Sequence, residues 1–301
     1  MKIAITGGSG FLGGYVVEKL KSEKYNPIIF TRKKIFEIEN GCEYRVTDYS
    51  KQDLVEKLAD IDAVVHLAAK RGSQGKISEF HDNEILTQNL YEACYERSIL
   101  NIVFASTISV YSDQNTLPWT EKDLPAPKLM YGVSKLVNEY IGNIYSEKGG
   151  LFIKNLRLAH IFGFNEKNNY MINRFMRQAF HRETLVVRGK SMAKREFLYA
   201  KDAAKAIVNA LQKHDLSGTF NIGSGEAFTN LEVAEIINRV FDNKGNICLQ
   251  DPEGDEGIES SYMDSSKSKE ILEFSPSYTF ESALKEIYVL MRRLDNVPLW
   301  Y

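Results

Sequence analysis

The sequence predicts an α/β protein: a doubly wound parallel sheet with helices on both faces, followed by a smaller C-terminal α/β lobe. Strand-like and helix-like segments alternate through the first half of the chain, which is typical of parallel βαβ units. Two strand-like segments, DAVVHL at 62–67 and LNIVFA at 100–105, are almost entirely apolar, which indicates burial on both faces of a sheet.

The first half of the chain supplies the sheet. A strand at 2–6 leads into a glycine turn and then into an amphipathic helix. Further strands are predicted at 26–32, 43–46, 62–67, 100–105 and 152–158, and further helices at 51–59, 82–97 and 130–147.

From residue 163 onward the rhythm changes. Predicted helices lie at 168–181, 202–213 and 230–241, strands at 185–188, 195–199 and 219–222, and a helical tail at 265–295 is interrupted by Ser275–Pro276. We therefore divide the chain into a sheet domain at 1–162 and a smaller, substrate-binding lobe at 163–301. We expect some segments of the second part to return to the first domain.

The turn after the first strand favours binding of a dinucleotide. Gly7, Gly10 and Gly13 have G-x-x-G-x-x-G spacing, one residue longer than the usual fingerprint. We expect Gly7 to allow the tight turn, Gly10 to let the backbone approach the phosphates, and Gly13 to let helix and strand pack closely. The helix start, at Phe11 and Leu12, then presents its N–H groups to the anion. Glycines also mark ordinary turns, so the flanking strand and helix are what indicate a Rossmann-type domain.

Composition and charge argue against several classes of partner. The 301 residues carry a net charge of −2, which gives no global attraction to nucleic acid or to an anionic membrane. No apolar run approaches the ~20 residues that a membrane span requires, and the chain starts directly with a strand instead of a signal peptide. The three cysteines are far apart and the five histidines lack metal-site spacing, so we expect a cytoplasmic protein without a bound metal.

Tyr131 and Lys135 are the first candidates for chemistry. They lie four residues apart on the predicted helix 130–147, so their side chains share a face. An ammonium group near a phenol lowers the pKa of the phenol, and such a tyrosine exchanges protons when an alcohol and a ketone interconvert beside a nicotinamide. Tyr15 and Lys19 have the same spacing, so spacing alone does not separate a catalytic pair from a chance pair. Only Tyr131 follows the fifth strand and two hydroxyl residues.

Those two residues, Ser106 and Thr107, directly follow the strand at 100–105. Ligands of doubly wound sheets bind beyond the carboxyl ends of the strands. We therefore expect both hydroxyls to hydrogen-bond a small-molecule substrate. The alternative is local turn bonding, which is common for Ser and Thr.

Together these segments resemble the extended short-chain dehydrogenase/reductases, a family of sugar-nucleotide epimerases, dehydratases and 4-ketosugar reductases. The similarity covers nearly the whole chain. The matching segments are TGGSGFLGG (6–14), VVHLAA (64–69), NEILTQNLYEAC (83–94), FASTISVYS (104–112), YGVSK (131–135), REFLYAKDAAKAI (195–207) and FNIGSGEAFTNLEVAEII (220–237).

The resemblance implies a role for each matched residue. Tyr131 would be the acid/base, Lys135 would tune it and hold the nicotinamide ribose, and Thr107 would orient the sugar oxygen. The residues implied in binding are Leu67, Ala68 and Ala69 under the cofactor, Asp48 at the adenine, and Asn169 and Arg195 at the nucleotide diphosphate.

The segment after the second strand departs from the family pattern. An acid there usually binds the ribose hydroxyls of NAD, whereas this chain has FTRKK at 30–34. Arg32 suits the 2′-phosphate of NADP, and the alternative is a solvated basic turn. We therefore favour NADP and keep NAD as the alternative.

A second departure concerns the reaction. Family dehydratases have Asp-Glu directly after the active-site Thr, but here Ile108 and Ser109 follow it. Neither transfers a proton at neutral pH, which disfavours 4,6-dehydration.

A third departure concerns the substrate. The diphosphate-binding arginine that usually precedes the tail block at 258–267 is missing, and 251–256 reads DPEGDE instead. Arg188 or Arg195 would have to serve in its place. His160 stands where asparagine is usual, either as a changed substrate contact or as a packed histidine.

These observations favour an NADP-preferring 4-ketoreductase of nucleotide sugars, because NADPH is normally the cellular reductant. A nucleotide-sugar 4-epimerase is the close alternative. A non-catalytic NADP-binding sensor on the same fold is the alternative of another class, but a sensor does not need Tyr131, Lys135 and Thr107 together. The resemblance also implies a homodimer through the helices at 82–97 and 130–147.

Overall fold

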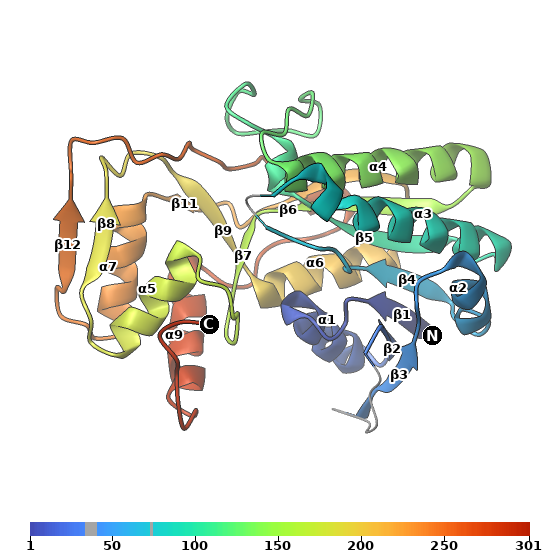
Figure 1. The fold of residues 1–301 in the computed structure, drawn as a ribbon, viewed down its shortest axis with the longest axis horizontal. Coiled ribbons are helices and arrows are strands. Elements are labelled where there is room, and N and C mark those ends of the chain that lie inside the picture. Colours follow the sequence, from blue (N-terminus) through green and yellow to red (C-terminus); the bar gives the residue numbers. More distant parts are fainter. Residues whose placement is uncertain (34–40, 73–74) are drawn as a thin grey trace.

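The computed structural model describes residues 1–33, 41–72 and 75–301; Lys34, the end of the basic segment, lies outside them. Two lobes lie side by side (Figure 1). The larger lobe contains the N-terminus and the parallel sheet, and the smaller one contains most of the C-terminal half.

The larger lobe is built on a seven-stranded sheet in the order β10-β6-β5-β4-β1-β2-β3. All its strand pairs are parallel, which confirms the predicted doubly wound α/β fold. The strand order reverses between β1 and β4, which makes this the switch point where ligands of such sheets bind. The strands are β1 (Lys2–Thr6), β2 (Asn26–Thr31), β3 (Glu43–Val46), β4 (Ala63–His66), β5 (Asn101–Thr107), β6 (Phe152–Leu158) and β10 (Gly218–Ile222).

Helices cover both faces of the sheet, as its apolar strands require. On one face, α1 (Phe11–Ser22) and α6 (Ala200–Gln212) share a core with strand residues such as Ile5. On the other face, α2 (Lys51–Lys57) and α3 (His81–Glu96) share a core with strand residues such as Val64. The long helix α4 (Met130–Gly149) packs against α3 and β6.

The smaller lobe has a core of its own, rich in aromatic side chains. A capping box starts one of its helices, because Thr229 accepts the Glu232 N–H at 3.2 Å and the Glu232 carboxylate accepts the Thr229 N–H at 2.8 Å. The elements are β7 (His160–Phe162), α5 (Met171–Phe180), β8 (Leu185–Arg188), β9 (Arg195–Tyr199), β11 (Ala227–Phe228), α7 (Asn230–Val240), β12 (Ile247–Gln250) and α9 (Phe280–Met291).

The chain returns to the larger lobe after entering the smaller one. Following β9, α6 packs against α1, and β10 then pairs with β6 at the edge of the sheet. The predicted helical tail is two helices: α8 (Ser266–Ile271), which contacts β10, and α9 in the smaller lobe. The interruption between them contains the Ser275–Pro276 break.

The sequence does not predict β7, β11 and β12. β7 and β11 have three and two residues, too few for an alternating pattern to be recognised. β12 has four residues, but its last three are exposed, so it has no buried face for a pattern to indicate. Within the described residues, no helix has the length and apolarity needed to cross a membrane, and no three His, Cys, Asp or Glu side chains gather to hold a metal ion.

Candidate active site

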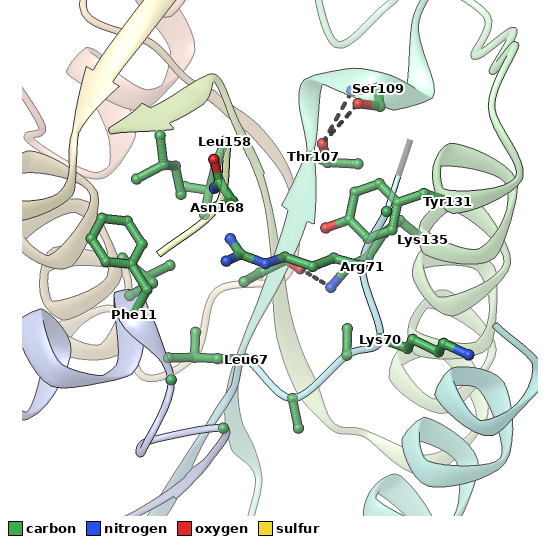
Figure 2. Close-up of a pocket in the computed structure, with 18 of the residues that line it drawn as sticks. Phe11, Leu67, Lys70, Arg71, Thr107, Ser109, Tyr131, Lys135, Leu158 and Asn168 are labelled. Carbon is green, nitrogen blue, oxygen red and sulfur yellow. Dashed lines mark hydrogen bonds between the residues drawn. The ribbon is translucent and has the colours of Figure 1, made fainter. Parts of the chain in front are cut away.

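A cavity of about 1060 Å³ opens at the carboxyl ends of the strands and is lined by both lobes. Its walls come from the glycine turn, from the loops after β2 and β4, from the ends of β5 and β6, and from the residues around the start of α5. Figure 2 shows side chains from several of these segments around the cavity, among them Phe11, Leu67, Thr107 and Asn168. The volume is at the upper end of the range for small-molecule sites, ~300–1,000 Å³, which suits a dinucleotide and a second molecule together.

The glycine turn fits the phosphates of a dinucleotide. Gly7 has a φ of +72°, and a Cβ there would lie 2.8 Å from the backbone nitrogen of Ala68. A Cβ on Gly13 would lie 2.3 Å from the carbonyl oxygen of Gly7, so α1 approaches the turn only because residue 13 has no side chain. Gly10 is the N-cap of α1, which leaves the start of the helix free to face an anion. The residues of this segment that line the cavity include Gly7, Gly10, Phe11, Leu12 and Gly13.

The end of β4 lies beside this turn, where Leu67, Ala68 and Ala69 line the cavity. The Ala68 N–H donates to the Thr6 hydroxyl at 3.2 Å, and that oxygen lies 2.7 Å from Nδ1 of His66. Burial lowers the pKa of His66 to about 3, so the ring is neutral. Hydrogen bonds between uncharged groups therefore join the end of β1 to the end of β4.

The cavity wall is basic where β2 ends. Arg32 and Lys33 line it, beside Tyr49. Asp48 is exposed and is not among the described residues that line the cavity; its carboxylate accepts the Ser50 N–H at 2.7 Å. The implied contact of Asp48 with the adenine therefore stays a prediction, and one carboxylate oxygen of Asp48 is bonded to its own chain.

Tyr131 and Lys135 face the cavity from one side of α4 (Figure 2). The Lys135 Nζ donates to the carbonyl oxygen of Ala105 at 2.7 Å and lies 4.7 Å from the centre of the Phe104 ring. Burial lowers the pKa of Lys135 to about 8. This ammonium group is thus held between β5 and the cavity.

Burial raises the pKa of Tyr131 to about 12. The sequence predicts the opposite direction, because Lys135 is one helical turn away. In the structure Lys135 Nζ lies 5.9 Å from the centre of the Tyr131 ring, and Arg71 is the cation that counters the effect of burial. The phenol form of Tyr131 is therefore favoured in this arrangement.

The competing pair, Tyr15 and Lys19, has a different role. The Tyr15 hydroxyl donates to the carbonyl oxygen of Phe164 at 3.0 Å, and Lys19 pairs with Glu23 at 2.5 Å. Tyr15 thus joins α1 to the loop after β7, and Lys19 makes a surface ion pair.

The two hydroxyls at the end of β5 differ in their surroundings. Thr107 Oγ1 accepts the Ser109 N–H at 3.2 Å and donates to Ser109 Oγ at 3.3 Å, at the wall of the cavity (Figure 2). The Ser106 hydroxyl donates instead to Glu139, whose carboxylate pairs with Arg157 at 2.7 Å. The expectation of two substrate-binding hydroxyls therefore fits Thr107 only, because the Ser106 proton is committed to a buried ion pair.

Two of the residues expected from the C-terminal half reach the cavity. His160 lines it with Nε2 3.0 Å from the Ser261 hydroxyl, and burial lowers the pKa of His160 to about 3, so the ring is neutral. Arg195 lines it and donates to Asn230 Oδ1 at 2.8 Å.

Asn169 and Arg188 lie elsewhere. The Asn169 amide donates to the carbonyl oxygen of Tyr301 at 2.6 Å, and Arg188 donates to Gln250 Oε1 at 3.0 Å. Neither is among the described residues that line the cavity, so the cavity does not support the substrate contacts expected of them. Asn168 lines the cavity in place of Asn169, because the loop presents the preceding side chain.

The sequence analysis misses several polar residues of the cavity wall. Arg71 lies in the loop directly after β4, so the rule that ligands bind beyond strand ends could have identified it. Ser109 contacts Thr107 through both its N–H and its hydroxyl, which no sequence pattern indicates. Tyr170 depends on the packing of the smaller lobe, for which the local sequence has no signal. The residues missed include Arg71, Ser109, Asn168 and Tyr170.

Comparison with known proteins agrees with this geometry. The sequence model described as the NAD dependent epimerase/dehydratase family matches residues 3–223. A solved structure of a UDP-N-acetylglucosamine 4-epimerase from Bacillus cereus is 64% identical and covers 100% of both chains with a TM-score of 0.93. A UDP-glucuronic acid 4-epimerase from Bacillus cereus, solved with UDP-glucuronic acid and NAD, is 25% identical over 97% of this chain and 99% of its own, with a TM-score of 0.84. A Bacillus subtilis (strain 168) protein described as an uncharacterized UDP-glucose epimerase is 30% identical over 94% of this chain and 96% of its own.

Proposed function

The chain belongs to the NAD dependent epimerase/dehydratase family, and from this premise we propose that it is a UDP-sugar 4-epimerase acting on UDP-N-acetylglucosamine. The observation that most supports the proposal is that Tyr131, Lys135 and Thr107 line one cavity together with the glycine turn. The 64% identity to a UDP-N-acetylglucosamine 4-epimerase supports the choice of sugar. Membership of a family of enzymes also removes the non-catalytic sensor from consideration.

The epimerase replaces the 4-ketoreductase as the favoured reaction. The two solved relatives at 64% and 25% identity are both described as 4-epimerases. The preference for net reduction depended only on Arg32 and on the usual cellular role of NADPH. Arg32, at the ribose end of the cavity, does not determine whether the enzyme catalyses net reduction of a 4-keto sugar or oxidises a 4-hydroxyl group and reduces it again.

Each of three cavity residues has its own role in the proposed reaction. A nicotinamide dinucleotide, with its phosphates at the glycine turn, would supply hydride exchange at the C4 carbon of the sugar. Tyr131 would take the proton of the 4-hydroxyl group and return it to the same oxygen. Thr107, already bonded to Ser109 at the cavity wall, would hold that oxygen in place. Lys135 would add positive charge behind the tyrosine.

Two observations bear on the choice of dinucleotide. The family is described as NAD dependent, and the 25% identical epimerase was solved with NAD. Arg32 lines the cavity at the end of β2, which supports a 2′-phosphate and hence NADP. The relative affinity for NAD and NADP decides between them.

We also infer a homodimer through α4. Val137, Tyr140 and Ile144 follow one another at helical spacing, and 40%, 54% and 50% of their surfaces are exposed. An exposed apolar stripe favours packing against another apolar surface. The family resemblance implies that α3 and α4 pack against the same two helices of a second copy.

The proposal is tested by incubating the purified protein with UDP-N-acetylglucosamine and either NAD or NADP, and by identifying the products with NMR. We expect the C4 epimer to accumulate to equilibrium with no net change in the cofactor. UDP-glucose and UDP-glucuronic acid serve as comparison substrates. Inactivity toward all three UDP-sugars would overturn the proposal, and stoichiometric oxidation of NADPH with a 4-keto sugar would establish the reductase instead.

A further inference from the structure

An ion pair joins the two lobes at the cavity wall to which Arg71 belongs. Arg71, in the loop after β4, donates to both carboxylate oxygens of Glu166 at 2.9 and 3.1 Å. Glu166 lies in the loop between β7 and α5, and only 3% of its side chain is exposed, against 52% for Arg71. A bidentate pair of this kind fixes the orientation of the guanidinium plane.

Both ends of this pair are anchored. The Glu166 Oε1 also accepts the Asn168 N–H at 3.3 Å, and the Glu166 carbonyl oxygen accepts from Arg177 at 3.3 Å. On the other side, Asn83 holds the loop of Arg71: its Oδ1 accepts the Lys70 N–H at 2.7 Å. The Asn83 amide donates to Ser134 on α4 at 3.1 Å. The guanidinium of Arg71 is therefore held from both lobes.

Arg71 and Tyr131 both line the cavity, and the charge of Arg71 lowers the pKa of the Tyr131 phenol against the effect of burial. Figure 2 shows the Arg71 side chain crossing the cavity on the side to which the Tyr131 oxygen points. Two titratable groups shift the pKa of Tyr131, Arg71 from the loop after β4 and Tyr170 from the loop before α5. A third, Lys135 on α4, has its Nζ 5.9 Å from the centre of the Tyr131 ring. The two cations, Arg71 and Lys135, are held differently: Lys135 is bonded to the Ala105 carbonyl oxygen, and Arg71 is bonded to Glu166.

We propose that Glu166 is a positioning residue that holds Arg71 beside Tyr131, and that Arg71 thereby stabilises the negative charge that Tyr131 acquires when it acts as a base. This inference depends on the proposed function for its role in turnover. A cation within a few ångströms favours the ionised form of a phenol. Because Glu166 belongs to the loop that leads into α5, the Tyr131 phenol ionises most readily only when this loop and the loop after β4 are joined.

The test compares four variants by the pH dependence of kcat/KM: Arg71→Gln, Arg71→Lys, Glu166→Gln and the double variant Arg71→Gln/Glu166→Gln. Arg71→Gln is expected to raise the apparent pKa of the acidic limb by ~1 unit. Glu166→Gln is expected to shift it in the same direction, and the double variant is expected to match Arg71→Gln. Arg71→Lys keeps the charge and is expected to restore part of the shift.

Glu281→Gln serves as the matched control. It removes a surface Arg–Glu pair, since Glu281 bonds Arg239 at 2.7 Å on the smaller lobe. Its pH profile is expected to stay that of the wild type, and thermal unfolding of every variant checks that the fold is retained.

Three results would overturn the inference. If Arg71→Gln leaves the apparent pKa of the acidic limb unchanged, the charge of Arg71 does not act on Tyr131. The same conclusion follows if Arg71→Lys has the same apparent pKa as Arg71→Gln. A lower apparent pKa in Glu166→Gln would show that Arg71 stays beside the phenol without its partner, so Glu166 would not be positioning it.

A second measurement does not depend on turnover. The ultraviolet absorbance of the phenolate is titrated in each protein, and the titration of its Tyr131→Phe counterpart is subtracted to isolate Tyr131. Ionisation is expected to begin at lower pH when Arg71 and Glu166 are both present, and equal onsets would contradict the inference. If the wild type fails to epimerise any UDP-sugar, the proposed function fails while this titration still decides the role of Arg71.

Discussion

The carbonyl oxygen of Ser109 occupies the place where a Cβ on Gly132 would be: a Cβ built there lies 2.2 Å from it. Ser109 belongs to the 3₁₀ turn that follows β5, and Gly132 follows Tyr131 on α4. The absence of a side chain at residue 132 therefore lets α4 bring Tyr131 up to the end of β5.

Gly132→Ala is expected to lower both stability and activity, because the backbone of the turn has to move away from α4. Overpacking of this kind costs ~1–3 kcal/mol in the free energy of unfolding. Urea unfolding and kcat provide the two measurements. The control is Gly14→Ala in α1, where a Cβ meets no atom within 4 Å. The control should be no less stable than the wild type, and equal effects at both glycines would contradict the argument.

Tyr131→Phe removes the hydroxyl group that exchanges the proton in the proposed reaction. Loss of a general acid/base lowers kcat by ~10²–10⁴, while the affinity for the dinucleotide should not change. Steady-state kinetics and a cofactor-binding titration measure the two effects. Tyr15→Phe, from the other Tyr–Lys pair of equal spacing, should retain turnover. Wild-type kcat in Tyr131→Phe would remove Tyr131 from the mechanism.

Arg32→Ala tests the choice of dinucleotide. If Arg32 binds a 2′-phosphate, its removal costs a charge-assisted hydrogen bond of ~1.5–3 kcal/mol, which weakens NADP binding by at least tenfold. Binding of NAD, which has no such phosphate, is the internal control and should stay the same. Fluorescence titration of the two dinucleotides gives both constants. Tighter binding of NAD than of NADP by the wild type would decide the question against NADP.

Lys154 makes stability depend on pH. It is fully buried in β6, donates to Asn101 Oδ1 at 2.6 Å, and burial lowers the pKa of Lys154 to about 7. An unfolded lysine titrates near ~10.4, so between these values the unfolded state binds more protons and stability rises with pH. The free energy of unfolding of the wild type should therefore rise relative to that of Lys154→Met from about pH 7 toward about pH 10. Urea unfolding at several pH values measures this difference, and a constant difference would show that Lys154 does not titrate there.

Tyr140→Arg tests the homodimer. A charged side chain in the middle of the apolar stripe of α4 cannot be buried between two copies without a partner, so we expect a monomer. Val289→Arg is the control, because Val289 on α9 has a similar exposure of 49%. Light scattering after gel filtration gives the mass of each protein. A wild type that is already monomeric, or a Tyr140→Arg variant that stays dimeric, would reject this interface.

The sheet could be predicted because its signals are local and long. Almost entirely apolar strands such as 62–67 indicate a sheet that is buried on both faces. The glycine turn lies directly between a strand and a helix, which indicates a Rossmann-type unit. The matched motifs likewise identified Tyr131, Lys135 and Thr107, which the structure places at one cavity.

What the sequence misses depends on distant contacts. Arg71 and Glu166 are 95 residues apart, and no periodicity or motif connects them. The resemblance points to Asn169, but motif matching does not determine which of two adjacent side chains a loop presents, and the cavity is lined by Asn168. The direction of the Tyr131 pKa was wrong for a related reason: helical spacing indicates that Lys135 is near, but not that burial outweighs it or that its Nζ is bonded to Ala105.

The return of α6 and β10 to the sheet has a consequence for how this chain is synthesised. The edge strand beside β6 and the helix that covers α1 come from residues 200–222, after the chain has already built part of the smaller lobe. A nascent polypeptide therefore cannot complete its nucleotide-binding half on the ribosome until those residues have left the exit tunnel. A recombinant fragment ending at residue 162 would expose the apolar faces of α1 and β6 and should aggregate.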